Sequence, residues 1–156
     1  MFAFEADFGL DLRCIPMAVR RKLDLAGVKL KLVHWHGLEA GERRRLLAWS
    51  DDAAAILGLR DWLLERSAGL PQGPAGTLPP QPEDWPEACA PPPDLLQTCT
   101  DLGLDLPAGA WSQLDVLQRF ALVKLGRSGH EHRNLAAALT EFGLRAEGRA
   151  APADDC

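Results

Sequence analysis

Two stretches of the chain match each other without gaps, and together they decide the fold. Residues 26–47 read AGVKLKLVHWHGLEAGERRRLL, and residues 102–123, which lie 76 positions further on, read LGLDLPAGAWSQLDVLQRFALV. The apolar positions of both stretches keep helical spacing, which predicts an internally duplicated unit. The register also extends to the C-terminal part of each unit. The identical pairs are Gly27/Gly103, Leu30/Leu106, Trp35/Trp111, Leu38/Leu114, Arg43/Arg119, Leu46/Leu122, Leu59/Leu135, Leu63/Leu139 and Glu65/Glu141.

The first helix of each unit is bounded by proline and glycine. Pro16 and Pro93 suit a first helical position, because the N–H that proline lacks would be unpaired there. Gly27 and Gly103 suit the left-handed cap that ends a helix. Between these limits apolar residues recur at helical spacing, and this pattern places Cys99 in the core.

Two further helices complete each unit. In the second unit, Asp115 and Gln118 predict a capping box at the start of a largely apolar helix. The next helix opens with Ser128 and Glu131, which have the same spacing, and its counterpart in the first unit covers about residues 52–66. The predicted fold is therefore mainly α-helical, with two tandem three-helix units.

The N-terminus has a different pattern. Apolar residues alternate with acidic or small residues over residues 2–12, and residues 28–32 alternate with lysines. This period of two is typical of extended chain. Two alternatives follow: a small β-ribbon between these segments, or an unpaired extended arm lying in a groove.

Proline divides the chain. Nine of the twelve prolines lie between Gly69 and Pro93, so this stretch cannot form a helix. The predicted organisation, within one compact domain overall, is an arm plus unit 1, a proline-rich linker or surface loop, unit 2 and a flexible tail. The four parts are residues 1–68, 69–93, 94–144 and 145–156.

The charge balance excludes several functions. The chain has 17 Lys and Arg against 22 Asp and Glu, which disfavours general nucleic-acid binding. No apolar run is long enough for a membrane span, and acidic residues near Met1 disfavour a secretory signal. The four cysteines contain no C-x-x-C pair and are expected to be free thiols. A cytoplasmic protein is the resulting expectation.

The basic residues are concentrated. Residues 13–31 hold six basic residues and one acid, whereas residues 82–118 hold seven acids and no base. This separation favours docking to a charged partner, with two solvated faces as the alternative. Three consecutive arginines, residues 43–45, are splayed around a helix and cannot all serve one site. Trp49, Trp62 and Trp85 have no tryptophan at the repeat offset, so they are the candidates to face a partner.

The possible metal ligands are histidines. His34 and His36, like His130 and His132, form an H-x-H pair, but residues two apart do not face one side of a helix. No metal site is therefore assigned. Cys14 precedes the first helix, where Arg13 and the helix dipole could lower its pKa, although a partly buried and inert thiol is the preferred interpretation. The common catalytic motifs are missing, so we expect no enzyme and no catalytic residue.

The sequence resembles the conserved nitrate reductase-associated protein family. The first block of the resemblance consists of Phe4-Glu5-Ala6-Asp7-Phe8, Arg13-Cys14-Ile15-Pro16-Met17, Val19-Arg20, Lys22-Leu23-Asp24, and Gly27-Val28-Lys29-Leu30-Lys31-Leu32 followed by Trp35. The second block consists of Leu117-Gln118-Arg119-Phe120-Ala121-Leu122, Lys124-Leu125, His130-Glu131, Asn134-Leu135, Ala137-Ala138-Leu139 and Glu141-Phe142-Gly143-Leu144. The resemblance implies a cytoplasmic accessory protein that acts with assimilatory nitrate reductase or its assembly factors. The implied role is maturation of that enzyme or loading of its molybdenum cofactor, with no cofactor held by the chain itself and no catalytic residue to transfer.

These observations together predict a partner-binding surface. It joins the basic segment of residues 13–31 to the first turn of the last helix, and its candidate residues are Arg13, Arg20, Arg21, Lys22, His130, Glu131 and Asn134. Two other functions stay open: a small metal- or anion-binding sensor that uses histidines and arginines, and a helix-turn-helix regulator.

Overall fold

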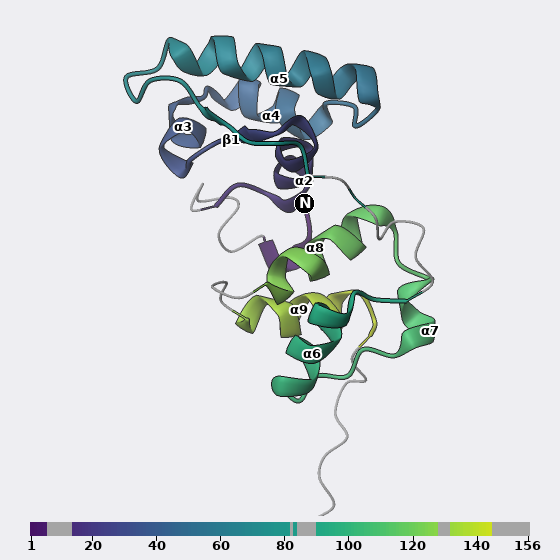
Figure 1. The fold of residues 1–156 in the computed structure, drawn as a ribbon. Helices are drawn as coiled ribbons and strands as arrows, with labels where there is room; N and C mark the ends of the chain where they lie inside the picture. The colour runs from purple at the N-terminus through teal and green to yellow at the C-terminus, as the bar shows by residue number, and fades with distance from the viewer. Residues whose placement is uncertain (6–13, 82, 84–89, 128–131, 145–156) are drawn as a thin grey trace, which may run out of the picture. The chain divides into compact units, whose positions relative to one another are not determined.

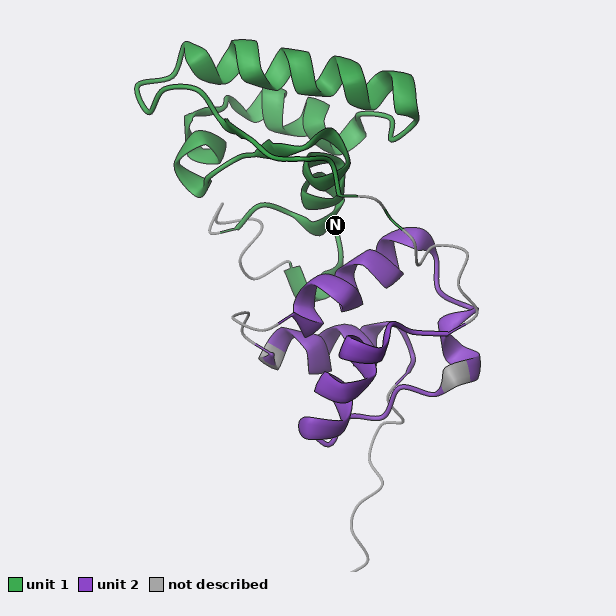
Figure 2. Ribbon diagram, in the orientation of Figure 1, with its two compact units in different colours: residues 1–83 green, residues 84–156 purple. Residues whose placement is uncertain are grey.

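The computed structural model describes residues 1–5, 14–81, 83, 90–127 and 132–144 (Figure 1). The chain divides into two compact units, Met1–Glu83 and Asp84–Cys156, and the boundary falls inside the proline-rich stretch (Figure 2). Both units are built almost entirely from helices, which confirms the mainly α-helical class. None of the helices described combines the length and the apolar composition needed to cross a bilayer.

Each unit contains four α-helices within the described residues. Unit 1 has the 3₁₀ helix η1 (Ala3–Glu5), α2 (Met17–Ala26), β1 (Val28–Lys29), α3 (Leu32–Gly37), α4 (Ala40–Ala48), α5 (Ala53–Ala68) and β2 (Gly76–Thr77). Unit 2 has α6 (Pro93–Asp101), α7 (Ala108–Trp111), α8 (Val116–Gly126) and α9 (Arg133–Glu141).

The prediction of three helices per unit was wrong at the tryptophans. Trp35 and Trp111 lie in additional short helices, α3 and α7, which come before the predicted second helices α4 and α8. Both side chains are almost completely buried, with 2% and 0% of their surface exposed. One or two turns of helix suffice to direct an indole into the core, and such a short helix gives little periodicity from which to predict it.

The core of unit 1 lies between α2, α4 and α5. Val19 of α2, Leu46 of α4, and Leu59 and Leu63 of α5 are fully buried. The long helix α5 packs against α2, and α2 also contacts α4 (Figure 1). Trp35, Leu38 and Val28 extend the same cluster towards α3 and β1.

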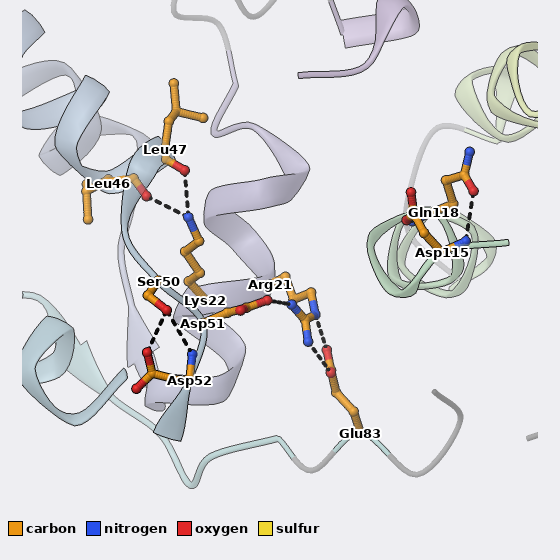
Figure 3. Close-up of polar contacts among 10 residues, drawn as sticks. All are labelled: Arg21, Lys22, Leu46, Leu47, Ser50, Asp51, Asp52, Glu83, Asp115 and Gln118. Atoms are coloured by element: carbon orange, nitrogen blue, oxygen red, sulfur yellow. Dashed lines mark hydrogen bonds and ion pairs between the residues drawn. The ribbon is translucent and has the colours of Figure 1, made fainter. Parts of the chain in front are cut away.

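The core of unit 2 is centred on α8. This helix packs against α6 on one side and α9 on another, as its apolar sequence predicted. Phe120, Leu122 and Leu125 of α8 are buried, as is Cys99 of α6, which confirms the prediction for this cysteine. The predicted capping box also forms, since Asp115 Oδ1 accepts the Gln118 N–H at 2.8 Å and Gln118 Oε1 accepts the Asp115 N–H at 2.9 Å (Figure 3).

Several residues at the 76-residue offset have the same local structure. Pro16 and Pro92 are both N-cap residues with φ of −57°, and Gly27 and Gly103 both have φ of 64°. The indole Nε1 atoms of Trp35 and Trp111 are both buried, and neither has a hydrogen-bond partner among the described residues. The duplication itself stays a prediction with which these local equivalences agree.

Pairing of residues 28–32 with the N-terminal segment, one of the two predicted alternatives, is not found among the described residues. Ala3–Glu5 is a 3₁₀ helix, and Val28 and Lys29 pair antiparallel with Thr77 and Gly76. Residues 6–13, the rest of the predicted arm, lie outside the described residues. Buried Glu5 has a different task, because its Oε1 accepts the N–H of Met17 at 2.6 Å and so satisfies the first turn of α2.

Part of the proline-rich stretch binds to unit 1. We call residues 70–81 the strap. Leu70 and Ala75 are buried, the Leu78 N–H donates to the Gly27 carbonyl at 2.9 Å, and the Gln81 N–H donates to the Asp24 carbonyl at 2.9 Å. The strap therefore covers the C-terminal end of α2 as a surface segment.

The strap approaches Gly27 so closely that a larger residue would clash there, whereas no such clash arises at Gly103. A Cβ on Gly27 would lie 2.2 Å from the Leu78 carbonyl oxygen, whereas a Cβ on Gly103 meets no atom within 4 Å. Both residues have the same positive φ, so substitution by alanine carries the same conformational free-energy cost at both positions.

We expect Gly103→Ala to lower the free energy of unfolding by about 1–2 kcal/mol. Gly27→Ala should lower it by clearly more, because the strap must also be displaced. Thermal denaturation followed by circular dichroism measures both variants. Equal losses in the two variants would contradict the described packing of the strap on Gly27.

Candidate functional site

Lys22, a candidate for partner binding, has an internal role. Its side chain is buried, with 8% exposed, and Nζ donates to the carbonyls of Leu46 at 3.0 Å and Leu47 at 2.7 Å (Figure 3). These carbonyls belong to the last turn of α4, where carbonyls lack the usual helical partner; the Leu46 carbonyl also accepts the Trp49 N–H at 3.4 Å. Burial lowers the pKa of Lys22, and the neighbouring Arg21 charge lowers it further while Asp51 opposes the shift. Lys22 thus joins α2 to the end of α4.

Arg21 holds two acidic side chains. Its Nε and Nη2 donate to the two carboxylate oxygens of Glu83 at 2.9 and 2.8 Å, and Nη1 donates to Asp51 (Figure 3). The Arg21 and Glu83 side chains are only 14% and 12% exposed, so this bidentate pair is shielded from solvent. Burial tends to lower the pKa of Arg21, but the hydrogen bonds to Glu83 and Asp51 outweigh it and raise the pKa overall.

The remaining candidates for partner binding are less constrained. Arg20 is half-buried, and its Nε donates to the Ile15 carbonyl at 2.8 Å. Asn134 lies in the first turn of α9 and is partly exposed. Arg13, His130 and Glu131 lie outside the described residues, as does the predicted Ser128–Glu131 capping box. The basic docking surface therefore stays a prediction.

The three consecutive arginines of α4 face different surroundings. Arg43 Nη1 donates to the carbonyls of Leu38 and, at 3.3 Å, Trp35, which lie at the end of α3. Arg44 is exposed, whereas the Arg45 guanidinium lies over two indole rings. The prediction that these residues cannot serve one site is confirmed.

Arg45, Trp49 and Trp62 form a partly exposed cluster at the junction of α4 and α5. The centres of the two indoles are 5.5 Å apart, and the Arg45 guanidinium carbon lies 4.7 Å from the Trp49 ring centre and 5.0 Å from that of Trp62. Trp49 is held in place because its Nε1 donates to the Ala55 carbonyl at 2.9 Å. We call these three residues the Trp–Arg cluster.

Two shallow hollows border the Trp–Arg cluster. One is lined by Arg45, Ala48, Trp49, Ser50 and Ala55. The other is lined by Trp62, Glu65, Arg66 and Gly69. Sequence reasoning singled out Trp49 and Trp62 but missed Arg45. The spacing of four residues between Arg45 and Trp49 in a helical segment was the available signal.

The histidines have separate environments. His34 is buried, and its Nδ1 accepts the Lys31 N–H at 3.1 Å, which satisfies the first turn of α3. His36 is exposed, and His132 is the N-cap residue of α9. No group of three or more His, Cys, Asp or Glu side chains with metal-site geometry occurs within the described ranges. His34, His36 and His132 therefore belong to no such group, and His130 lies outside the described residues.

The two described cysteines are shielded rather than activated. Burial raises the pKa of the Cys14 thiol; the Arg20 charge opposes this shift and Glu5 adds to it. Burial also raises the pKa of Cys99. The pKa of Cys14 is thus raised, and not lowered as the helix dipole and Arg13 could have caused. This direction agrees with the preferred interpretation of a partly buried and inert thiol.

Glu42 links α4 to α5. Its carboxylate accepts hydrogen bonds from Arg66 Nε and, at 3.2 Å, Arg66 Nη2, and it accepts the Glu39 N–H at 2.7 Å. The hydrogen bond from Arg66 is the main cause that lowers the pKa of Glu42, with burial opposing it. A carboxylate whose pKa is lower in the folded state stabilises the fold at pH values above its ordinary pKa. This stabilisation is lost as the pH falls through the folded-state pKa.

We expect Lys22→Met to lower the free energy of unfolding by about 1–3 kcal/mol, because two carbonyls at the end of α4 lose their hydrogen bonds from the buried ammonium group. Lys29→Met is the matched control, since Lys29 is an exposed lysine of the same unit. Urea denaturation at neutral pH compares the two variants. A Lys22→Met midpoint equal to that of the control would contradict the capping role.

We expect Glu42→Gln to lower stability by about 0.5–1 kcal/mol at neutral pH, because the Arg66 contact is partly exposed. The difference from the unmodified protein should shrink as the pH falls below about 4. Thermal melts at a series of pH values measure it. A difference that stays constant down to the acid limit would show that ionised Glu42 contributes nothing.

Comparison with known proteins identifies the family. Neither the curated proteins nor the solved structures contain a match to this chain. The model of one protein family, described as conserved nitrate reductase-associated protein, matches residues 1–142 and so spans both structural units. The chain therefore belongs to the conserved nitrate reductase-associated protein family.

Proposed function

We propose that this protein is a non-catalytic accessory protein of assimilatory nitrate reductase, which it contacts directly or through an assembly factor. The observation that carries the proposal is the family match over residues 1–142, because the family is described by association with that enzyme. The match covers every helix of the described residues, which supports a role of the whole fold rather than of one appended motif.

A binding protein can assist maturation by a simple physical route. If it binds the cofactor-free form of the reductase more tightly than the loaded form, it shifts the population towards the form that accepts the cofactor. The accessory protein then needs no cofactor of its own. Its link to the molybdenum cofactor is indirect, and its place of action is the cytoplasm.

We expect the purified protein to bind cofactor-free nitrate reductase at least about tenfold more tightly than the loaded enzyme. Isothermal titration of both enzyme forms measures the ratio. Equal affinity for the two forms of the enzyme would be consistent with association but would contradict the maturation role. An absence of binding to either form, with assembly factors added, would overturn the proposal as a whole.

The predicted basic surface can be tested within the same assay. Charge removal at Arg21 or Lys22 would break internal contacts, so those variants test folding as well as binding. Lys29 and Lys31 lie in the same basic segment and are exposed. Lys29→Gln/Lys31→Gln should therefore weaken binding and reduce its salt dependence if this segment faces the partner. Unchanged affinity and salt dependence would remove this segment from the interface.

A further inference from the structure

The Trp–Arg cluster, defined above by Arg45, Trp49 and Trp62, has the composition of a binding hot spot. Tryptophan and arginine are the residues that most often dominate protein interfaces, especially where a hollow receives a partner side chain. Both indoles are only partly buried although they pack against the core of unit 1. Since the Trp49 indole is also fixed by its hydrogen bond to Ala55, the cluster offers a preorganised surface.

Within the described residues, Arg45 stacks on indole rings but has neither an acidic partner nor a backbone acceptor. Within the part of the chain that the structure describes, Arg66 is paired with Glu42, and Arg43 donates to backbone carbonyls. No ion pair of Arg45 is found in the same described ranges. A guanidinium whose face is stacked on indoles still has N–H donors in its plane, which match the two oxygens of a carboxylate.

The lining of the hollow beside Arg45 indicates which side chain would lie next to a carboxylate bound by Arg45. Ala48, Ala55 and the Trp49 ring give it an apolar wall, and Ser50 adds a hydroxyl group at its border. Such a lining suits a small aliphatic side chain. The second hollow, beyond Trp62, contains Glu65 and the already neutralised Arg66, so the carboxylate is assigned to the Arg45 side.

We propose that the Trp–Arg cluster is a docking site for a segment of a partner protein that carries an acidic side chain next to an aliphatic one. The carboxylate pairs with Arg45, and the aliphatic side chain enters the hollow along Trp49. The inference rests on the proposed function for the identity of the partner, namely nitrate reductase or an assembly factor, but not for the chemistry of the site.

The chain offers a closely matched control. Arg44 is adjacent in sequence and exposed, and it carries the same charge, but it does not line either hollow. Arg45→Gln and Arg44→Gln therefore change net charge equally and differ only in the cluster. Arg45→Lys keeps the charge but loses the planar guanidinium, so it should fall between the unmodified protein and Arg45→Gln.

The first experiment is titration of purified nitrate reductase with the full-length protein and these variants. We expect Arg45→Gln to weaken binding by about tenfold or more and Arg44→Gln by less than about twofold. Binding that is weakened equally by both variants, or by neither, would overturn the docking site while leaving the proposed function intact. Circular dichroism melts confirm that each variant remains folded.

The second experiment does not depend on the identity of the partner. A phage-displayed library of random peptides is selected on the full-length protein, and the enriched peptides are then measured against both arginine variants. We expect peptides with Asp or Glu beside Leu, Ile or Val, whose binding is lost in Arg45→Gln and kept in Arg44→Gln. Enriched peptides without this pattern, peptides that bind Arg45→Gln equally well, or no enrichment would each overturn the site. If the reductase fails to bind but these peptides do, the proposed function falls and the docking site stands.

Discussion

Backbone carbonyls at the C-terminal ends of short helices are the constraint on which much of this structure depends. A helix leaves its last four carbonyls without helical partners, and in a helix of one or two turns these are most of its acceptors. Four cationic side chains donate hydrogen bonds to carbonyls at such helix ends. Lys22 serves α4, Arg43 serves α3, Arg60 serves α2 through Ala26 and Gly27, and Arg119 serves α7 through Trp111 and Ser112.

Each of these contacts also fastens one element to another. Lys22 is itself on α2 and Arg60 is on α5, so two of the three helices that enclose the core of unit 1 are capped from a neighbour. The positive charge interacts favourably with the negative end of the helix dipole, which adds to the hydrogen bonds. These four of the 17 basic side chains thus have a role within the fold.

This explains which features could be predicted from sequence. The burial of Cys99, the left-handed Gly27 and Gly103, and the Asp115–Gln118 box depend on local spacing, and they were predicted correctly. The partner of β1 was not, because alternation shows that a segment is extended but not which distant segment pairs with it. Likewise a basic residue looks the same in sequence whether it donates to a carbonyl, as Lys22 does, or remains available, as Arg45 does. The three-dimensional contacts of each basic residue therefore decide whether it is a candidate for partner binding.

The buried indoles of Trp35 and Trp111 have a practical consequence. Each core contains one, and both Nε1 atoms are buried without a hydrogen-bond acceptor among the described residues. In an NMR spectrum of the intact chain, the proton on such an atom exchanges with solvent only when the surrounding core opens. The indole resonances of Trp35 and Trp111, one for each unit, would thus report the opening rates of the two units separately. A ligand that slows hydrogen exchange at only one of the two indoles would show which unit it binds.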